Sequence, residues 1–179
     1  MHHHHTSADS LEQKGWARCY LKFLKKAPEL IACSEETREN LIKVCEGRSV
    51  TKLLYLIPEL DNIEENKGEG IKLPASRRLR FGYMGRLVST KGINIICELS
   101  DDPDLDEIEW HLYGEGPDYN SEYFNRFENL NCHGRYEGIK ECRAIHNYLD
   151  AVVLFSRHTE GMPLSLTEAM SSGLPWIAT

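Results

Sequence analysis

The stretch from Leu79 to Gly92 reads LRFGYMGRLVSTKG, a short apolar segment that runs into a loop with two basic residues. From here on, apolar segments of strand length alternate with segments of helix length, at spacings of about 20–35 residues. This alternation predicts an α/β fold, a parallel sheet with helices on both faces. The predicted strands are 79–84, 109–113, 130–133, 151–155 and 176–178, and the predicted helices are 92–99, 121–129, 139–148 and 164–171.

The residues before this region are less regular. Ser34 is suited to cap a helix over 35–45, because its hydroxyl can accept a hydrogen bond from an amide of the first turn, and Gly47 would end that helix. The apolar run 53–57 predicts a buried strand. Residues 61–72 are rich in Glu, Asn, Lys and Gly, which predicts a surface loop or linker.

Composition limits the classes of protein and of partner. The 179 residues are 41% hydrophobic and 27% charged, as in soluble globular proteins, and allow one domain with a piece of another. The formal net charge of -7 argues against nucleic acid as a partner. No apolar run suits a membrane span or signal peptide, so we expect a cytoplasmic protein, with peripheral attachment at the inner membrane face through missing parts as an alternative.

Cysteines and histidines indicate no metal site. The six cysteines stand singly, without a Cys-x-x-Cys pair, so we expect reduced and mostly buried thiols. His2–His5 follow Met1 and resemble a purification tag or its remnant, which is favoured over a metal-binding tract and is left out of the fold argument. His111 and His133 lie in apolar strands, where core or strand-edge positions are the favoured interpretation, and receive no role.

The loop after the strand 79–84 is the first candidate site. Gly85 lets the chain turn close to a ligand, and Arg86 and Lys91 bring two cations to one strand-to-helix loop, which suits a diphosphate. The alternative is that both side chains are merely solvated. A second glycine-rich turn, 113–117 (YGEGP), ends the next strand and is by itself a weak signal.

The stretch 160–175 carries the third candidate site. Pro163 suits the first position of a helix, where its missing amide has no partner to lose. The amides of Gly161, Met162 and Leu164 would then lie at the positive end of the helix dipole, where a phosphate is stabilised.

Two carboxylates flank this predicted phosphate site. Glu160 precedes the helix and Glu168 lies about one turn inside it, so each is suited to accept hydrogen bonds from neutral hydroxyls, as sugars offer. The alternative makes Glu160 a partner of the helix dipole and Glu168 an exposed helix residue.

Three stretches together, GYMGRLVSTKG, LYGEGP and SRHTEGMPLSLTEAMSSGLPWIAT, resemble one family. They are similar to the C-terminal, donor-binding domain of retaining glycosyltransferases of the GT-B fold, the family 4-like group 1 enzymes. The resemblance covers roughly residues 31–179 and implies a Rossmann-like donor domain that is incomplete at its C-terminus. It divides the chain into a tag or disordered tail (1–10), the end of an N-terminal domain with its linker (11–73) and a nucleotide-sugar-binding domain (74–179).

The resemblance also implies a reaction and its residues. A sugar would pass from a nucleotide-diphosphate sugar to an acceptor hydroxyl with retention, without cofactor or metal. The acceptor would be a saccharide or lipid-linked saccharide, and the missing N-terminal domain would bind it. The implied catalytic residues are Arg86, Lys91 and Glu160, and the implied substrate-binding residues are Gly85, Arg135, Gly161, Met162, Pro163, Leu164 and Glu168. Glu160 would hold the sugar, Glu168 the ribose, and the stretch 134–136 would lie near the base.

Three other interpretations stay open from the sequence. A non-catalytic nucleotide-sugar-binding module would keep the fold without turnover, and a sugar-nucleotide epimerase would consume donor without an acceptor. A plain α/β domain would bind no nucleotide.

Overall fold

The computed structural model describes residues 2–4, 22–46, 50–55, 77–158, 160 and 162–179. By its internal contacts the chain forms two compact units. The first unit comprises Met1–Ile57 and Thr159–Leu164, and the second comprises Pro58–His158 and Ser165–Thr179.

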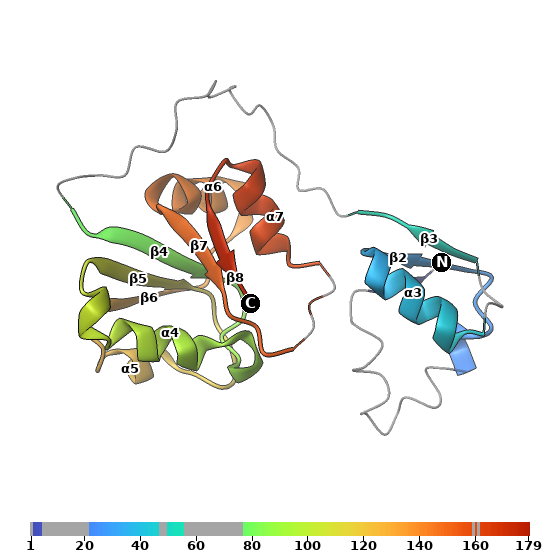
Figure 1. Cartoon of the computed structure of the whole chain (residues 1–179), viewed down its shortest axis with the longest axis horizontal. Coiled ribbons are helices and arrows are strands. Elements are labelled where there is room, and N and C mark those ends of the chain that lie inside the picture. The colour runs from blue at the N-terminus through green and yellow to red at the C-terminus, as the bar shows by residue number, and fades with distance from the viewer. Residues whose placement is uncertain (1, 5–21, 47–49, 56–76, 159, 161) are drawn as a thin grey trace. The chain divides into compact units, whose positions relative to one another are not determined.

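The second unit is built on a five-stranded sheet in which every neighbouring pair of strands is parallel (Figure 1). The sheet has the order β6-β5-β4-β7-β8, so the chain starts in the centre, builds outward to one edge and then crosses to the other side of β4. This order is that of a doubly wound, Rossmann-like sheet. Its strands are β4 (Leu79–Met84), β5 (Ile108–Tyr113), β6 (Leu130–Gly134), β7 (Ala151–Leu154) and β8 (Trp176–Ala178).

Helices cover both faces of this sheet, as the sequence predicts. In Figure 1, α4 and α5 lie on one side of the strands and α6 and α7 on the other. The helical elements are η1 (Ser89–Lys91), α4 (Ile93–Ser100), η2 (Pro103–Leu105), α5 (Ser121–Phe124), α6 (Gly138–Tyr148) and α7 (Leu164–Ser171).

The core of the second unit follows from strands that are apolar on both faces. All four residues of β7 are buried, as expected for a parallel strand covered by helices on either side. On one face of the sheet, Phe81 and Trp110 pack edge to face with ring centroids 5.6 Å apart. Both rings belong to the large cluster of apolar side chains that fills the second unit. Burial of each large apolar side chain contributes roughly 1.5–3 kcal/mol, so this cluster is the main stabilising feature of the unit.

The first unit has its own sheet, order β1-β2-β3, all parallel: β1 (His2–His4), β2 (Glu29–Ala32) and β3 (Val50–Leu53). Helix α3 (Glu35–Val44) begins after Ser34, whose hydroxyl accepts a hydrogen bond from the Thr37 amide at 3.2 Å. The predicted cap is therefore confirmed, while Gly47 lies outside the described residues. The opening histidines, which resemble a tag in the sequence, pair with β2 as an edge strand.

Two predicted elements differ from the structure. The predicted helix 121–129 is too long: α5 ends at Phe124, and the turns that follow, with the Phe127 amide bonded to the carbonyl of Phe124, bring Phe127 into the core. The predicted strand 53–57 is displaced: β3 pairs with β2 through Leu53, and Leu54 and Tyr55 are exposed beyond it. Residues 56–76, including the predicted linker, lie outside the described residues.

The described cysteines agree with the expectation of free thiols. Cys33, Cys45 and Cys97 are buried, and Cys132 and Cys142 are half-buried. Within the described ranges no helix is long and apolar enough to cross a bilayer.

Candidate functional site

The carboxyl ends of β4 and β7 form the switch point of the sheet. Strand β4 pairs with β5 on one side and with β7 on the other. The loop after β4 leads to α4 on one face, whereas the chain after β7 leads to α7 on the opposite face (Figure 1). Open α/β sheets bind ligands at such a point, outside the carboxyl ends of the strands.

The segment Gly85–Lys91, here called the cation loop, rests on the loop after β5. The Gly85 amide donates to the carbonyl of Tyr113 at 2.9 Å, and the Leu87 amide donates to the carbonyl of Glu115 at 3.0 Å. These bonds continue the ladder between β4 and β5 beyond the strands themselves. The path of the cation loop is therefore determined by its neighbour.

Two glycines allow this close packing. A Cβ atom at Gly116 would lie 2.0 Å from the carbonyl oxygen of Leu87. A Cβ atom at Gly92 would lie 1.9 Å from the carbonyl oxygen of Phe155, which follows β7. Only glycine lets backbone approach backbone this closely. The glycine-rich turn 113–117 therefore also supports the backbone of the cation loop, through the close contact of Gly116 with Leu87.

The chain after β7 also contacts the cation loop. The carbonyl of Thr90 accepts a hydrogen bond from the Arg157 amide at 2.8 Å. It also lies 3.2 Å from Nδ1 of His158, which must be the donor because a carbonyl only accepts. The loops after β4, β5 and β7 are thus joined by hydrogen bonds and close contacts at the carboxyl ends of the strands.

The charge that the cation loop offers is carried by its side chains. Arg86 is exposed and Lys91 is partly exposed, and both lie in the segment between β4 and α4. The amides of Gly85, Leu87 and Ser89 bind oxygen atoms of the protein. An anion at the carboxyl ends of these strands would therefore meet the guanidinium group of Arg86 and the ammonium group of Lys91 rather than those amides.

The predicted residues of the third motif fall in both units. Helix α7 begins at Leu164 as predicted, but Pro163 lies just before the helix rather than at its first position. Glu160, Met162, Pro163 and Leu164 belong to the first unit. Gly161 lies outside the described residues. Their relation to Arg86 and Lys91 stays a prediction.

Glu168 lies in the second unit and is half-buried rather than exposed. The thiol of Cys142 on α6 donates to Oε2 of Glu168 at 3.9 Å. Burial raises the pKa of the Glu168 carboxyl, and the thiol contact partly opposes that shift. Burial also raises the pKa of Tyr136 to about 12, with the Glu168 charge adding to the effect. Glu168 therefore faces the segment that follows β6, to which Arg135 belongs.

A buried histidine connects α6 to α7. His146 Nδ1 lies 2.8 Å from the hydroxyl oxygen of Ser172, which itself donates to the carbonyl of Glu168 at 3.0 Å. The Ser172 hydroxyl has one proton, so His146 Nδ1 is the donor. Burial disfavours the charged imidazolium and lowers the pKa of His146, so the ring is neutral. This neutral contact fixes the helix turn that carries Glu168.

Arg135 is exposed in the loop after β6. Its Nε lies 3.7 Å from Oε1 of Glu137, and both side chains are largely exposed. Such a pair contributes at most about 1 kcal/mol and leaves the guanidinium able to change partners.

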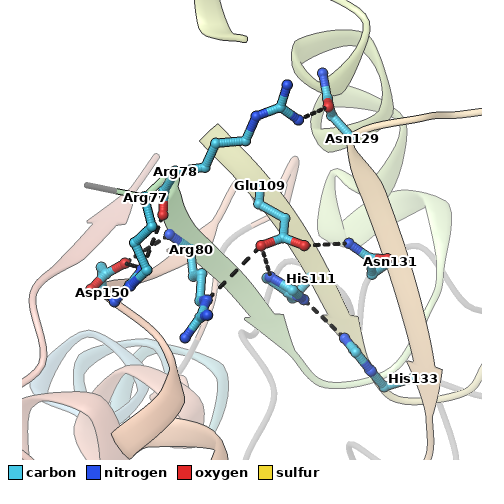
Figure 2. Close-up of polar contacts among 9 residues, drawn as sticks. All are labelled: Arg77, Arg78, Arg80, Glu109, His111, Asn129, Asn131, His133 and Asp150. Carbon is cyan, nitrogen blue, oxygen red and sulfur yellow. Dashed lines mark hydrogen bonds and ion pairs between the residues drawn. The ribbon is translucent and has the colours of Figure 1, made fainter. Parts of the chain in front are cut away.

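A separate polar cluster lies across β4, β5 and β6 (Figure 2). His111 Nδ1 is 2.9 Å from His133 Nε2, and His111 Nε2 is 3.5 Å from Glu109 Oε2. Burial lowers the pKa of both histidines, although the Glu109 carboxylate opposes the shift. His111 is buried and His133 is exposed on the edge strand β6, which confirms the core and strand-edge positions expected for them.

The start of β4 is tied to the start of β7 in the same view. Arg77 forms a bidentate pair with Asp150, at 2.7 and 2.9 Å, and Asp150 also accepts from the Arg80 amide at 2.8 Å (Figure 2). These contacts hold the amino ends of the strands and leave the carboxyl ends to the loops described above.

Sequence reasoning missed Asp118, Arg157 and His158, which bind the backbone of the cation loop. The signal for Asp118 was its place directly after the glycine-rich turn of the neighbouring strand. In the part of the chain that the structure describes, no three His, Cys, Asp or Glu side chains converge as a metal site would require.

Comparison with known proteins agrees with this architecture. HepE from Anabaena, solved with UDP and glucose, has a TM-score of 0.75 and 18% identity, over 99% of this chain and 51% of that chain. Sucrose-phosphate synthase from Thermosynechococcus elongatus has a TM-score of 0.73 and 18% identity, over 99% and 49%. A TarM mutant from S. aureus, solved with fondaparinux, alpha-GlcNAc-glycerol and UDP, has a TM-score of 0.71 and 21% identity, over 98% and 34%.

The second unit thus has the Rossmann-like fold of a GT-B glycosyltransferase domain. The sequence model of the family "Glycosyl transferases group 1" matches residues 78–179, more than half of the chain, and the chain belongs to this family. It spans about half the length of HepE. A search of curated protein sequences found no match.

Proposed function

We propose that this chain carries the donor site of a glycosyltransferase that moves a sugar from a nucleotide-diphosphate sugar to an acceptor hydroxyl, with retention at the anomeric carbon. One observation carries the proposal: in a member of this family, the loop with Arg86 and Lys91 stands at the switch point of the sheet. The UDP complexes of HepE and TarM support a nucleotide as the ligand.

The chemistry of the proposed step lies at the leaving group. As the bond between the anomeric carbon and the diphosphate breaks, negative charge grows on the diphosphate oxygens. Cations that bind this charge more strongly than the intact donor lower the barrier, because they favour the transition state over the ground state. Arg86 and Lys91 are proposed for this role. With retention, departure of the diphosphate and attack by the acceptor occur on the same face of the sugar.

The remaining predicted residues are assigned to binding. Glu160 is proposed to accept hydrogen bonds from the sugar hydroxyls, and Glu168 from the ribose. The half-buried position of Glu168 beside Tyr136 supports that assignment, because the segment 134–136 is proposed to lie near the base. Arg135 and Gly85 are proposed to line this donor site, and the segment Gly161–Leu164 to offer amides to the diphosphate or sugar.

Partners follow from the same proposal. The nucleotide sugar is the donor, and a saccharide or lipid-linked saccharide, held by a further N-terminal domain, is the proposed acceptor. We propose no cofactor, since the fixed cations can neutralise the leaving group.

A titration tests the proposal directly. ADP, GDP, UDP and dTDP are titrated against the 179-residue chain by calorimetry and by NMR, with thermal unfolding to show that the chain is folded. At least one diphosphate is expected to bind, and more tightly than its monophosphate, because the second phosphoryl group meets the cation loop. A folded chain that binds none of the four overturns the proposal.

A further inference from the structure

The turn that carries Lys91 lacks a cap from its own sequence. The 3₁₀ turn η1 begins after Val88, whose side chain cannot accept a hydrogen bond, and it ends at Gly92 in the left-handed conformation. The Gly92 amide closes the turn on the carbonyl of Ser89 at 3.2 Å. The end of the turn is therefore fixed locally, whereas its beginning requires an acceptor from elsewhere.

Asp118 supplies that acceptor from the loop after β5. Its Oδ2 accepts a hydrogen bond from the Ser89 amide at 2.7 Å, across 29 residues of sequence. Hydrogen bonds from the Ser89 amide and from its hydroxyl lower the pKa of the Asp118 carboxyl, so the residue is ionised at neutral pH. A charged acceptor of this kind forms short, strong bonds to an amide.

The glycine-rich turn delivers Asp118 to this position. Gly116 packs against the carbonyl of Leu87, and the Leu87 amide binds the carbonyl of Glu115. The two loops are therefore aligned backbone to backbone just before Pro117 and Asp118. The 3₁₀ turn η1 is held on its other side by the chain after β7, where the Arg157 amide donates to the carbonyl of Thr90.

We propose that Asp118 is a positioning residue for the diphosphate site: its carboxylate caps the Ser89–Lys91 turn and thereby sets the direction in which the Lys91 ammonium group is presented. This inference rests on the proposed function. Asp118 itself does not touch the diphosphate, which its charge would repel. It acts through the backbone of Ser89.

Substitutions at Asp118 separate this role from a simple charge effect. Asp118→Ala removes the acceptor, whereas Asp118→Asn keeps an acceptor oxygen and removes the charge. Glu115→Ala is the matched control, because it removes one carboxylate from the same loop and keeps the backbone carbonyl that binds Leu87. Electrostatics alone predicts that all three variants bind a diphosphate as well as, or better than, the wild type.

The measured quantity is the ratio of diphosphate to monophosphate affinity for the 179-residue chain, with the tightest diphosphate of the ADP, GDP, UDP and dTDP panel. Asp118→Ala is expected to lower this ratio about 3- to 10-fold, the effect of one lost hydrogen bond. Asp118→Asn is expected to keep most of the wild-type ratio, and Glu115→Ala is expected to leave the ratio unchanged. Amide hydrogen exchange at Ser89 is expected to become faster in Asp118→Ala only.

The outcomes distinguish this inference from the proposed function. If the folded wild-type chain binds no diphosphate, the proposed function falls and the inference falls with it. If the wild type binds but Asp118→Ala has an unchanged or higher ratio, only the inference is overturned. Should Asp118→Ala not fold, a Ser89 exchange rate in Asp118→Asn no slower than that of the neighbouring exposed amides overturns it.

Discussion

At the residue scale, single backbone contacts decide how the site is built. Gly116 has no side chain because the carbonyl of Leu87 occupies that space. We expect Gly116→Ala to lower the free energy of unfolding by about 2–3 kcal/mol, since the loops must separate to admit a methyl group. Urea unfolding measures this. Gly173→Ala is the control. An alanine at its φ of 68° costs about 1 kcal/mol of backbone strain, but no atom lies within 4 Å of the added carbon, so there is no steric clash. Equal losses in the two variants would contradict the steric argument.

The two cations of the loop are also tested one at a time. Under the proposed function, Arg86→Ala or Lys91→Ala in the complete glycosyltransferase is expected to lower kcat roughly 10²–10³-fold, because each substitution removes a cation proposed to bind the departing diphosphate. Arg78→Ala is a suitable control, since Arg78 precedes β4 and pairs with Asp106. Steady-state kinetics with a saturating donor gives the comparison. Near-normal kcat in both cation variants would remove these residues from the mechanism.

At the scale of elements, caps and buried histidines determine local stability. Ser34 caps α3 through its bond to the Thr37 amide. Ser34→Ala is therefore expected to destabilise the first unit by about 1 kcal/mol, and Ser34→Asn, which keeps a capping oxygen, by much less. Denaturation followed by an NMR signal from the first unit would measure both. A loss shared equally by the two variants would show that capping is not the cause.

The contact between α6 and α7 should make the second unit sensitive to acid. The pKa of His146 is lowered by burial from its ordinary 6.5, so below that pH the unfolded chain binds more protons than the folded chain. Stability is therefore full at pH 8 and falls as the pH drops from about 7 toward 5. His146→Gln should flatten this dependence in urea unfolding at pH 8, 6.5 and 5, and the exposed His158→Gln serves as the control. An unchanged slope in His146→Gln would assign the effect to other groups.

At the scale of the whole molecule, the two units have separate cores. The first contains Leu24, Leu30 and Leu41, and the second contains the large cluster around β4, β5 and β7. We expect a chain of residues 74–179, cut at the predicted domain boundary, to keep the parallel sheet, because each strand of that sheet lies within it. NMR spectra of the shortened and full chains should agree at Gly116 and Val153. A molten or aggregated product would contradict the predicted boundary.

The sequence by itself determined the α/β class, all five strands of the second sheet to within one residue at each end, and the positions of α4, α6 and α7. Those features depend on local apolar runs bounded by turn residues, which are visible in the order of the chain. The predicted helix 121–129 was too long, because the chain leaves the helix after Phe124 and buries Phe127 in the core, a tertiary contact that local helix preference does not record.

Only the tertiary structure decided the strand order, and with it the switch point beside β4. It also showed that Asp118 and Gly116 shape the cation loop, and that Glu168 is half-buried against α6. The reason is physical: hydrogen bonds and close contacts between residues 26–29 apart depend on how strands are placed side by side, and neither periodicity nor local composition records that placement.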